Sequence, residues 1–387
     1  MAIPQPRRVS GPRTIVIGAG VVGLFCALEI ARRGGNVVVI DADAAPFNGE
    51  APRAASYAAA GMLGAFSEAL HEGPRHHRRL SQLCAAGLRA WRALAQEDPA
   101  FARFIRFPGV LLLAYDDADA ARVQRACDRA RAQGEPADFF DGLAPDLDAR
   151  VFGARVTASA RLPTEGLVAP APMLAALAAR AVVMGASILR GRGVTEILAE
   201  DDVVRGVGFD DGGELRADRV VVATGALAPK FWKAVVPALA KVAPAKGMLG
   251  IARAPASMVT PEVVRTPRVY FIRDGSDVRF GATMEPGRAD LDEDPDAIAA
   301  LYLDLRKALP GVKFAATARQ ASVGIRPMSP DGAPLVGGNG PHGCVLAVGH
   351  GRNGWLLAPI TGEAVAAMVT GDDVAPVWAP FDPQRFS

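Results

Sequence analysis

Apolar and polar positions first follow a regular pattern from Thr14 onward. The apolar run TIVIG (14–18) leads into a glycine-rich turn, a segment with apolar residues every three or four positions (22–34), and a second apolar run that ends at Asp41. A short, uninterrupted apolar run is typical of a buried parallel strand, and the spacing of the middle segment is typical of a helix. We therefore predict one strand–helix–strand unit between Thr14 and Asp41.

The rest of the chain carries helix and strand signals in a mixed order. Helical spacing is found at 75–98, 117–133, 170–185, 294–309 and from about 356 onward. Strand signals are found at 109–115, 187–189, 194–199, 203–209, 214–217, 220–223 and 344–348, and further ones alternate through 245–285. This order predicts an α/β fold in which a Rossmann-like domain is interleaved with an α+β domain built on a mixed, largely antiparallel sheet.

Composition and charge exclude several classes of protein. Half of the 387 residues are hydrophobic, and 43 basic residues against 41 acidic ones give a net charge of +2. That balance gives no electrostatic reason to expect a nucleic acid or an anionic membrane as a partner. No apolar stretch reaches the roughly 18 residues that span a bilayer, and no secretory signal is visible. We expect a cytoplasmic protein without a membrane span.

Neither the cysteines nor the histidines form a recognisable reactive group. The cysteines have no metal-ligand or CxxC spacing, so no metal is expected, and two of them (26 and 344) fall in apolar runs typical of core positions. The histidines show no pairing with a nucleophile or a carboxylate that would indicate general-base catalysis. These residues are Cys26, Cys84, Cys127, Cys344, His71, His76, His77, His342 and His350.

The turn after the first strand has the GxGxxG pattern of dinucleotide-binding proteins. Gly18 permits the tight turn, Gly20 lets the backbone approach a pyrophosphate, and Gly23 lets the helix pack closely on the sheet. The N-terminus of the helix presents free N–H groups to the phosphates. Asp41, at the end of the second strand, can accept hydrogen bonds from ribose hydroxyls. Strand, turn, helix and acid together predict a dinucleotide site.

A later segment, VVVATG (220–225), favours FAD over NAD. A strand that ends in Ala-Thr-Gly is frequent where FAD-binding chains return beneath the ADP part of the cofactor. An ordinary buried strand and turn would explain the same letters equally well. The N-terminal position of the glycine motif, typical of one tightly held cofactor, supports FAD.

Four segments together resemble the D-amino-acid oxidase superfamily of flavoproteins, and within it the glycine oxidase branch associated with thiamine biosynthesis. They are the strand–helix–strand unit, SYAAAGMLGAFSE (56–68), VYFIRDGSDVRFGATMEPG (269–287), and GIRPMSPDGAPLVG with AVGHGRNGWLLAPITGE (324–363). PAKGMLGI (244–251) is similar to the strand that opens the family's substrate domain. The tail is the most specific part, because an RP…DGxPxxG stretch followed by GHxRNG is hard to reach by chance.

The resemblance implies a discontinuous FAD-binding domain and a substrate domain. The FAD-binding domain would comprise 13–80, 150–240 and 320–375, and the substrate domain 81–149 and 241–319. Residues 1–12, with three prolines and no apolar run, are expected to form a disordered arm. A homodimer and a homotetramer are both compatible with the resemblance.

The resemblance also assigns substrate contacts. In this family a cation and a hydroxyl hold the substrate carboxylate above the flavin; the matching residues are Arg326, expected in a glycine-rich loop, and Tyr270. Arginine suits the role because its planar guanidinium donates two parallel hydrogen bonds and stays charged. Arg352 matches a further active-site arginine, and Met62 and Met284 would line a small pocket. Alternative roles are an interdomain ion pair for Arg326, a half-buried strand aromatic for Tyr270, and loop fixation for Arg352.

The cofactor contacts implied by the resemblance lie in the same segments. Backbone N–H groups of 349–354 would approach the flavin ring oxygen, where negative charge builds on reduction. The histidine of that loop could instead only support it. The full set is Gly18, Ala19, Gly20, Val21, Val22, Asp41, Ala59, Ala60, Gly61, Met62, Val194, Thr224, Gly225, Arg326, His350, Gly351, Arg352, Asn353, Gly354 and Trp355.

Two departures from the family pattern change these expectations. Gly351 stands where the branch usually has a larger, often aromatic residue, which would open the pocket and weaken the case for glycine as the substrate. No cysteine lies between 324 and 337, where some relatives attach the flavin covalently. Non-covalent FAD is therefore expected.

The reaction implied is oxidative deamination of glycine, a small amino acid or a secondary amine. Hydride transfer from the α-carbon to flavin N5 would give an imino acid and, with oxygen as acceptor, hydrogen peroxide. Alternatives are a D-amino-acid or hydroxyproline dehydrogenase that uses another acceptor, a sarcosine-type oxidase, a tRNA-modifying flavin module, and a flavin-binding assembly subunit without turnover. The small net charge and the lack of a basic-aromatic patch argue against the tRNA module.

Overall fold

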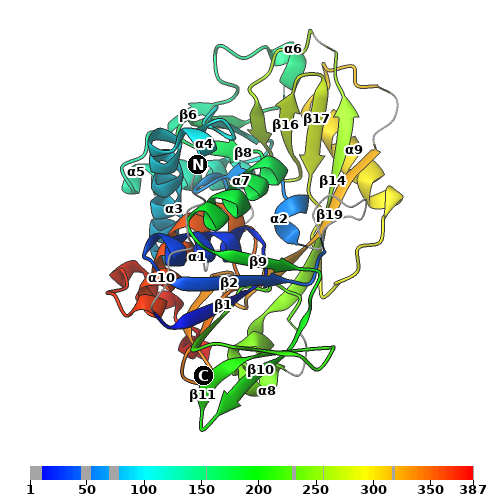
Figure 1. Ribbon diagram of the computed structural model, residues 1–387. Helices are drawn as coiled ribbons and strands as arrows, with labels where there is room; N and C mark the ends of the chain where they lie inside the picture. Colours follow the sequence, from blue (N-terminus) through cyan, green and yellow to red (C-terminus); the bar gives the residue numbers. More distant parts are fainter. Residues whose placement is uncertain are drawn as a thin grey trace, which may run out of the picture.

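The computed structural model describes residues 11–44, 54–68, 78–153, 155–228, 232–255, 257–315 and 319–386. Two large sheets dominate the molecule, one in the lower half and one in the upper half of Figure 1. The arm expected at 1–12 lies outside the described residues except for its last two positions. His71, His76 and His77 also lie outside them.

The lower sheet has the predicted strand–helix–strand unit at its centre. Its neighbours are parallel except for the outermost pair, β20–β21. Side chains alternate along a strand, so Val16 of β1 packs into the helical core while Ile15 and Ile17 pack into the core on the other face. Both faces are covered, as a parallel sheet requires. The order is β20 (Leu335–Gly338), β21 (Cys344–Val348), β13 (Arg219–Val222), β1 (Arg13–Ile17), β2 (Asn36–Asp41), β9 (Ser187–Arg190).

Helices cover one face of this sheet and a small antiparallel sheet covers the other. The helices are α1 (Val21–Arg32), α3 (Arg78–Glu97), α7 (Pro170–Val183) and α10 (Gly354–Thr370), and the small sheet is β10 (Val194–Glu200), β11 (Val203–Phe209) and β12 (Glu214–Arg216). Within the described residues, no helix combines the length and hydropathy needed to cross a bilayer.

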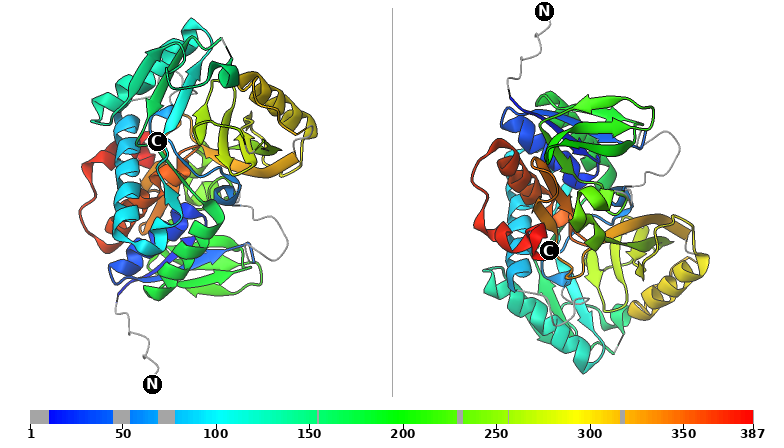
Figure 2. Two further views of the ribbon diagram at one scale, coloured as in Figure 1. Left: turned by 90° about the horizontal axis from the view of Figure 1, so that it is seen from above. Right: turned by 90° about the horizontal axis from the view of Figure 1, so that it is seen from below.

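The upper sheet is mixed and largely antiparallel; among its pairs, β5–β15 is parallel. Helix α9 (Pro295–Ala308) lies on its outer face in both views of Figure 2. The order is β18 (Glu285–Pro286), β14 (Ala243–Arg253), β17 (Asp277–Gly281), β16 (Tyr270–Asp274), β15 (Val263–Arg265), β5 (Val110–Ala114), β7 (Ala158–Leu162), β6 (Asp138–Asp141), and β19 (Arg319–Met328) pairs with β14.

Shorter elements connect the two sheets. A third small sheet consists of β3 (Met62–Leu63), β8 (Gly166–Val168) and β4 (Ile105–Arg106). The remaining helices are α2 (Ala55–Ala58), α4 (Pro99–Ala102), α5 (Asp117–Ala132), α6 (Ala149–Phe152) and α8 (Trp232–Val235), with 3-10 turns at Pro237–Lys241, Pro376–Phe381 and Pro383–Phe386. The segment 56–68, which carries part of the family resemblance, thus includes most of a short helix, α2, and a short strand, β3.

The α/β fold class is confirmed, and the long elements lie within a few residues of their predicted bounds. The main correction concerns Arg326, which lies on strand β19 and not in a glycine-rich loop; its register partner is Ala245. The Gly and Pro around it conceal the strand signal. Pro327 is tolerated there because, among the described strands, β19 pairs with β14 alone, and an edge strand can lack one N–H donor.

Candidate active site

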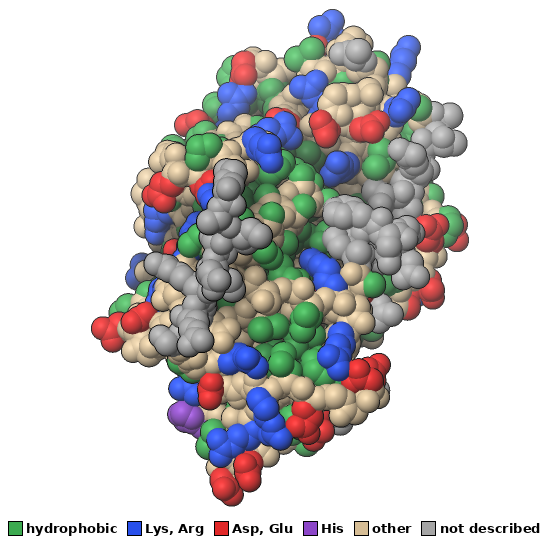
Figure 3. All heavy atoms as spheres, in the orientation of Figure 1, with side chains coloured by type: hydrophobic (Ala, Val, Ile, Leu, Met, Phe, Trp, Pro, Cys, Tyr) green, Lys and Arg blue, Asp and Glu red, His purple; other side chains and the backbone are tan. Residues whose placement is uncertain are grey.

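A cavity of about 580 Å³ lies where the two large sheets meet. One wall is formed by the carboxyl ends of β1, β2, β13 and β21, and the other by the facing residues of β14, β16, β17 and β19. Figure 3 shows hydrophobic side chains gathered near the middle of this face of the molecule, with Lys and Arg side chains around them. Ligand sites of α/β proteins lie at the carboxyl ends of the strands, which makes this cavity the candidate site.

The glycine turn gives the cavity a wall of bare backbone. Gly18 has φ +108°, and a Cβ there would lie 2.6 Å from the carbonyl oxygen of Ala223. A Cβ at Gly23 would lie 1.9 Å from the carbonyl oxygen of Gly18, so α1 packs directly on the turn. Gly20 faces the cavity beside Val21, the first residue of α1. These positions require glycine and leave the helix N-terminus open to a ligand.

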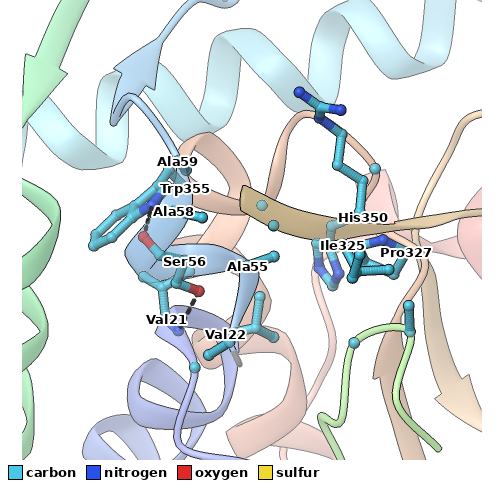
Figure 4. A pocket seen from close by; sticks show the side chains of 18 of the residues that line it. Val21, Val22, Ala55, Ser56, Ala58, Ala59, Ile325, Pro327, His350 and Trp355 are labelled. Atoms are coloured by element: carbon cyan, nitrogen blue, oxygen red, sulfur yellow. Dashed lines mark hydrogen bonds between the residues drawn. The ribbon is translucent and has the colours of Figure 1, made fainter. Parts of the chain in front are cut away.

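Ser56 of α2 ties the N-terminus of α1 to α10. The Val21 N–H donates to Ser56 Oγ at 3.0 Å, and the Trp355 indole N–H donates to the Ser56 carbonyl oxygen at 3.1 Å (Figure 4). One residue therefore fixes α1, α2 and α10 around the same end of the cavity.

The carboxylate of Asp41 stands at the carboxyl end of β2, as predicted. It accepts hydrogen bonds from the N–H groups of Ala19 at 2.5 Å and Asp43 at 2.9 Å, which hold it against the glycine turn. The Thr224 hydroxyl, at the end of β13, is buried and has no hydrogen-bond partner within the described part of the chain. A buried hydroxyl of this kind retains hydrogen-bonding capacity for a ligand.

These residues fit the dinucleotide part of FAD. The N-terminus of α1 suits a pyrophosphate, because the helix dipole favours an anion beside the bare backbone at Gly20. The Asp41 carboxylate suits a ribose diol. The unpartnered Thr224 hydroxyl gives the same end of the cavity a further polar contact.

Arg326 dominates the opposite end of the cavity. Its Nη1 donates to the carbonyl oxygen of Thr283 at 3.1 Å and lies 3.8 Å from the sulfur of Met284. Among the described residues, no carboxylate lies within 4.0 Å of this guanidinium. Burial lowers the pKa of Arg326, although an arginine stays charged at any physiological pH. The cavity therefore contains a part-buried cation without a carboxylate partner among the described residues.

Glycines on neighbouring strands make room for Arg326 and Tyr270. A Cβ at Gly247 of β14 would lie 1.9 Å from the Arg326 Nη1 atom, so the guanidinium occupies the space that a side chain would fill. A Cβ at Gly281 of β17 would lie 3.2 Å from the Tyr270 hydroxyl. The bare face of the sheet thus sets the position of both side chains.

Tyr270 is held as a neutral phenol. Burial raises its pKa to about 12, and the nearby Arg326 and Arg265 counteract only part of this effect. The Arg265 guanidinium carbon lies 5.6 Å from the centre of the Tyr270 ring. The hydroxyl therefore keeps its proton at physiological pH and can donate a hydrogen bond into the cavity.

Arg265, Glu68 and Arg352 form a charged network beside Tyr270. Glu68 accepts from Arg265 at 2.6 Å and from Arg352 at 3.4 Å. Arg265 is 1% exposed, whereas the Arg352 side chain is 31% exposed. One carboxylate thus neutralises a deeply buried arginine and also orients a second arginine that lines the cavity.

Glu165 fixes the turn that carries Glu68. It is fully buried and accepts the N–H groups of Phe66 at 2.5 Å and Ser67 at 2.9 Å. Burial raises the pKa of Glu165 to about 7, and these hydrogen bonds oppose the increase. A carboxyl group that titrates near neutrality therefore lies one layer behind the cavity wall.

His350 supports the loop before α10. It is 3% exposed, and its Nε2 lies 3.1 Å from the Thr361 hydroxyl. Burial lowers the pKa of His350 to about 4, so the imidazole is neutral at physiological pH. These properties match the alternative role proposed from the sequence, that of a loop-supporting histidine.

Most of the residues predicted for the site line this one cavity. Three do not: the Ala19 N–H donates to Asp41, Asn353 is buried at the start of α10, and Met284 contacts Arg326 from outside the lining. The residues that line it are Gly18, Gly20, Val21, Val22, Asp41, Ala59, Ala60, Gly61, Met62, Val194, Thr224, Gly225, Tyr270, Arg326, His350, Gly351, Arg352, Gly354 and Trp355.

Sequence reasoning missed several residues at the site. Ser56 and Glu68 are the first and last residues of a segment that carried the family resemblance, and that position was a signal that could have found them. No such signal marked three further residues, Arg265, Arg268 and Glu165. Arg265 and Glu165 bind partners distant in the sequence, and the position of Arg268 at the cavity depends on the folded arrangement of the strands.

The raised pKa of Glu165 leads to a prediction about stability. Its pKa is about 7 in the folded protein, against an ordinary value of 4.5 for a glutamate side chain. The folded state therefore binds the proton more tightly, so stability is full below about pH 4.5 and falls by roughly 3 kcal/mol as the pH rises through 7. Glu165→Gln keeps the acceptor oxygen and removes the charge. Its Tm should match wild type at pH 5 and exceed it at pH 8.

Thermal unfolding at a series of pH values measures this difference. Glu200→Gln is the control, because Glu200 is exposed on β10 and its loss should not change the pH dependence. Parallel curves for wild type and Glu165→Gln from pH 5 to pH 8 would contradict the prediction.

Comparison with known proteins agrees with this geometry. The DAO family model, described as FAD dependent oxidoreductase, matches residues 13–368. A glycine oxidase of Geobacillus kaustophilus is 30% identical over 377 residues, which cover 96% of this chain and 96% of that protein. A D-amino acid dehydrogenase of Rhizobium rhizogenes is 32% identical over 202 residues, which cover 51% of this chain and 47% of that protein.

The fold leads to the same family. The crystal structure of glycine oxidase from Geobacillus kaustophilus has a TM-score of 0.82 and 27% identity to this chain, and the match covers 97% of this chain and 99% of that one. The resemblance noted from the sequence is thereby confirmed, as is FAD as the cofactor. The chain belongs to the DAO family of FAD-dependent oxidoreductases, and it is an enzyme of FAD-dependent amine oxidation.

Proposed function

We propose that this enzyme oxidises glycine, another small amino acid or a small secondary amine that carries a carboxylate, such as sarcosine, at the carbon–nitrogen bond. The carbon loses two electrons and a proton, the amine becomes an imine, and water hydrolyses the imine. Oxygen is the proposed electron acceptor, which gives hydrogen peroxide.

Arg326 is the observation that carries this proposal. Arg326 is part-buried and has no carboxylate partner among the described residues, so its guanidinium remains available to an anion. The α-carboxylate of an amino acid supplies that anion, and it can accept two parallel hydrogen bonds from the planar guanidinium in a bidentate pair. Arg326 faces the cavity from β19, so a carboxylate bound there lies inside the cavity.

Tyr270 and Arg352 are proposed to complete the carboxylate site. Tyr270 supports this role because its phenol keeps its proton and lies against the bare face of the sheet at Gly281. Arg352 lines the cavity and is oriented by Glu68. Both side chains donate hydrogen bonds, which suits an anionic group and not an ammonium.

FAD is proposed to bind non-covalently along the glycine-turn end of the cavity. The six-stranded sheet and its helices then act as the FAD-binding part, and the face of the nine-stranded sheet acts as the substrate part. Bound FAD supplies the two-electron acceptor, while the protein supplies binding, orientation and exclusion of water. Gly20, Val21 and Asp41 are the proposed contacts to the dinucleotide.

The substrate is proposed to lose its ammonium proton to solvent before the reaction. Among the described groups near the substrate end, Tyr270 remains protonated, His350 is held by Thr361, and Glu68 is paired with arginines. None of them is placed to accept a proton near neutral pH. The rate should therefore rise with pH as the fraction of neutral amine increases.

A D-amino-acid dehydrogenase is the second candidate, favoured by the half-chain similarity to the protein of that name. It uses the same carboxylate site and differs in the electron acceptor. Peroxide release during turnover in air separates an oxidase from a dehydrogenase.

Anaerobic mixing of the FAD-loaded enzyme with single compounds tests the proposed function. Glycine, sarcosine, D-proline and a set of D-amino acids should include at least one compound that removes the visible absorbance of oxidised flavin. The matching amines without a carboxylate should not do so, because Arg326 then lacks its anion. Flavin that stays oxidised with every amino acid would exclude amino-acid oxidation.

A second prediction concerns the glycine beneath Arg326. Gly247→Ala places a methyl group where the guanidinium lies and should raise KM about tenfold or more, because misplaced contacts weaken substrate binding steeply. The control is Gly208→Ala on β11, where a Cβ lies no closer than 3.4 Å to any atom. Steady-state kinetics on the best substrate measures both variants, and an unchanged KM for Gly247→Ala would contradict the packing role.

A further inference from the structure

The substrate end of the cavity carries more positive charge than one carboxylate neutralises. Arg265, Arg268, Arg326 and Arg352 all line the cavity. Glu68 is the acidic side chain among the described lining residues at this end, and two of these arginines share it, Arg265 at 2.6 Å and Arg352 at 3.4 Å. An α-carboxylate on Arg326 leaves further positive charge uncompensated.

Arg268 contributes clearly to this excess of positive charge. Among the described residues, no carboxylate lies within 4.0 Å of its guanidinium, although many exposed arginines of this chain are paired, such as Arg161 with Asp146 and Arg192 with Asp211. It is exposed and also lines the cavity, so it lies where the cavity opens to solvent. A cation at the opening of a substrate cavity favours an anion that reaches outward from the bound substrate.

The backbone around Arg268 is fixed. The Thr266 hydroxyl accepts the N–H groups of Arg268 at 3.2 Å and Val269 at 3.0 Å, and it lies 2.8 Å from the Val269 carbonyl oxygen, to which it donates. This turn joins β15 to β16, and Tyr270 begins β16 two residues after Arg268. The guanidinium is therefore presented from a rigid turn next to the proposed carboxylate site.

Gly351 presents bare backbone to the cavity. It lines the cavity without a side chain, and a Cβ there would lie 3.3 Å from the sulfur of Met328. The positive φ of +55° also disfavours a larger residue at this position. Glycine itself has no second anion for Arg268.

We propose that the preferred substrate is an acidic amino acid or an acidic amine. Its second carboxylate binds Arg268 and is also attracted by the positive charge of Arg352. The proposal rests on the proposed function and specifies its substrate class. Arg326 holds the α-carboxylate inside the cavity, and Arg268 holds the second carboxylate at the opening. A neutral amide of the same size leaves Arg268 without its anion.

Matched pairs of substrates test the proposal on the FAD-loaded enzyme. The pairs are aspartate with asparagine, in both stereochemical forms, and N-(carboxymethyl)glycine with its monoamide. In at least one pair the acid should have a kcat/KM about tenfold or more above that of the amide, because a charge-assisted pair forms only with the acid. The preference should decrease as the salt concentration rises.

The variant Arg268→Gln tests the contribution of Arg268 to the preference for acids. The acid-to-amide ratio of kcat/KM should fall about tenfold in this variant, and Arg268→Lys should restore part of the ratio because it restores the charge. Arg216→Gln is the control, since Arg216 is exposed on β12 outside the cavity lining, and its ratio should equal that of wild type.

The outcomes separate the two proposals. Amides oxidised as well as acids by wild type, or an unchanged ratio in Arg268→Gln, would overturn the inference while amino-acid oxidation stands. An enzyme whose flavin no amino acid reduces would overturn the proposed function itself.

Discussion

A part-buried arginine without a carboxylate partner among the described residues is the constraint on which this site depends. Arg326 projects from β19 into the space that Gly247 leaves bare, so its position follows from the register of two strands. A bound anion compensates this charge once a ligand displaces water from the cavity. Tyr270 lies against the same bare surface at Gly281 and remains a neutral donor. We propose that the upper sheet thereby acts as a preorganised receptor for a carboxylate.

The lower sheet and its helices are the proposed FAD-binding part, and a few side chains hold the two sheets together. Ser56 binds the N-terminus of α1 and the indole of Trp355. Glu68 connects Arg265 of the upper sheet with Arg352 in the loop before α10. The distance between a bound cofactor and a bound substrate is therefore set by contacts between segments remote in sequence.

The sequence predicted what local patterns determine. The unit from Thr14 to Asp41 has apolar periodicity, required glycines and a terminal acid, and each was recognisable without a structure. Arg326 was recognised through the GIRP motif that contains it. Its strand was missed because the neighbouring Gly and Pro interrupt the apolar alternation typical of a strand. Arg265 and Glu165 could not be predicted, since their importance comes from partners about 100 to 200 positions away, as the hydrogen bonds of Glu165 to Phe66 and of Arg265 to Glu68 illustrate.

The most direct test of this account is the binding of a small carboxylate that lacks an amine, such as glycolate, to the FAD-loaded enzyme, followed through the visible spectrum of the flavin. Arg326→Ala should raise the Kd about 100-fold, because a charge-assisted pair of about 3 kcal/mol is lost. FAD itself should remain bound in the variant. An unchanged Kd would contradict the assignment of Arg326 as the receptor for the substrate carboxylate.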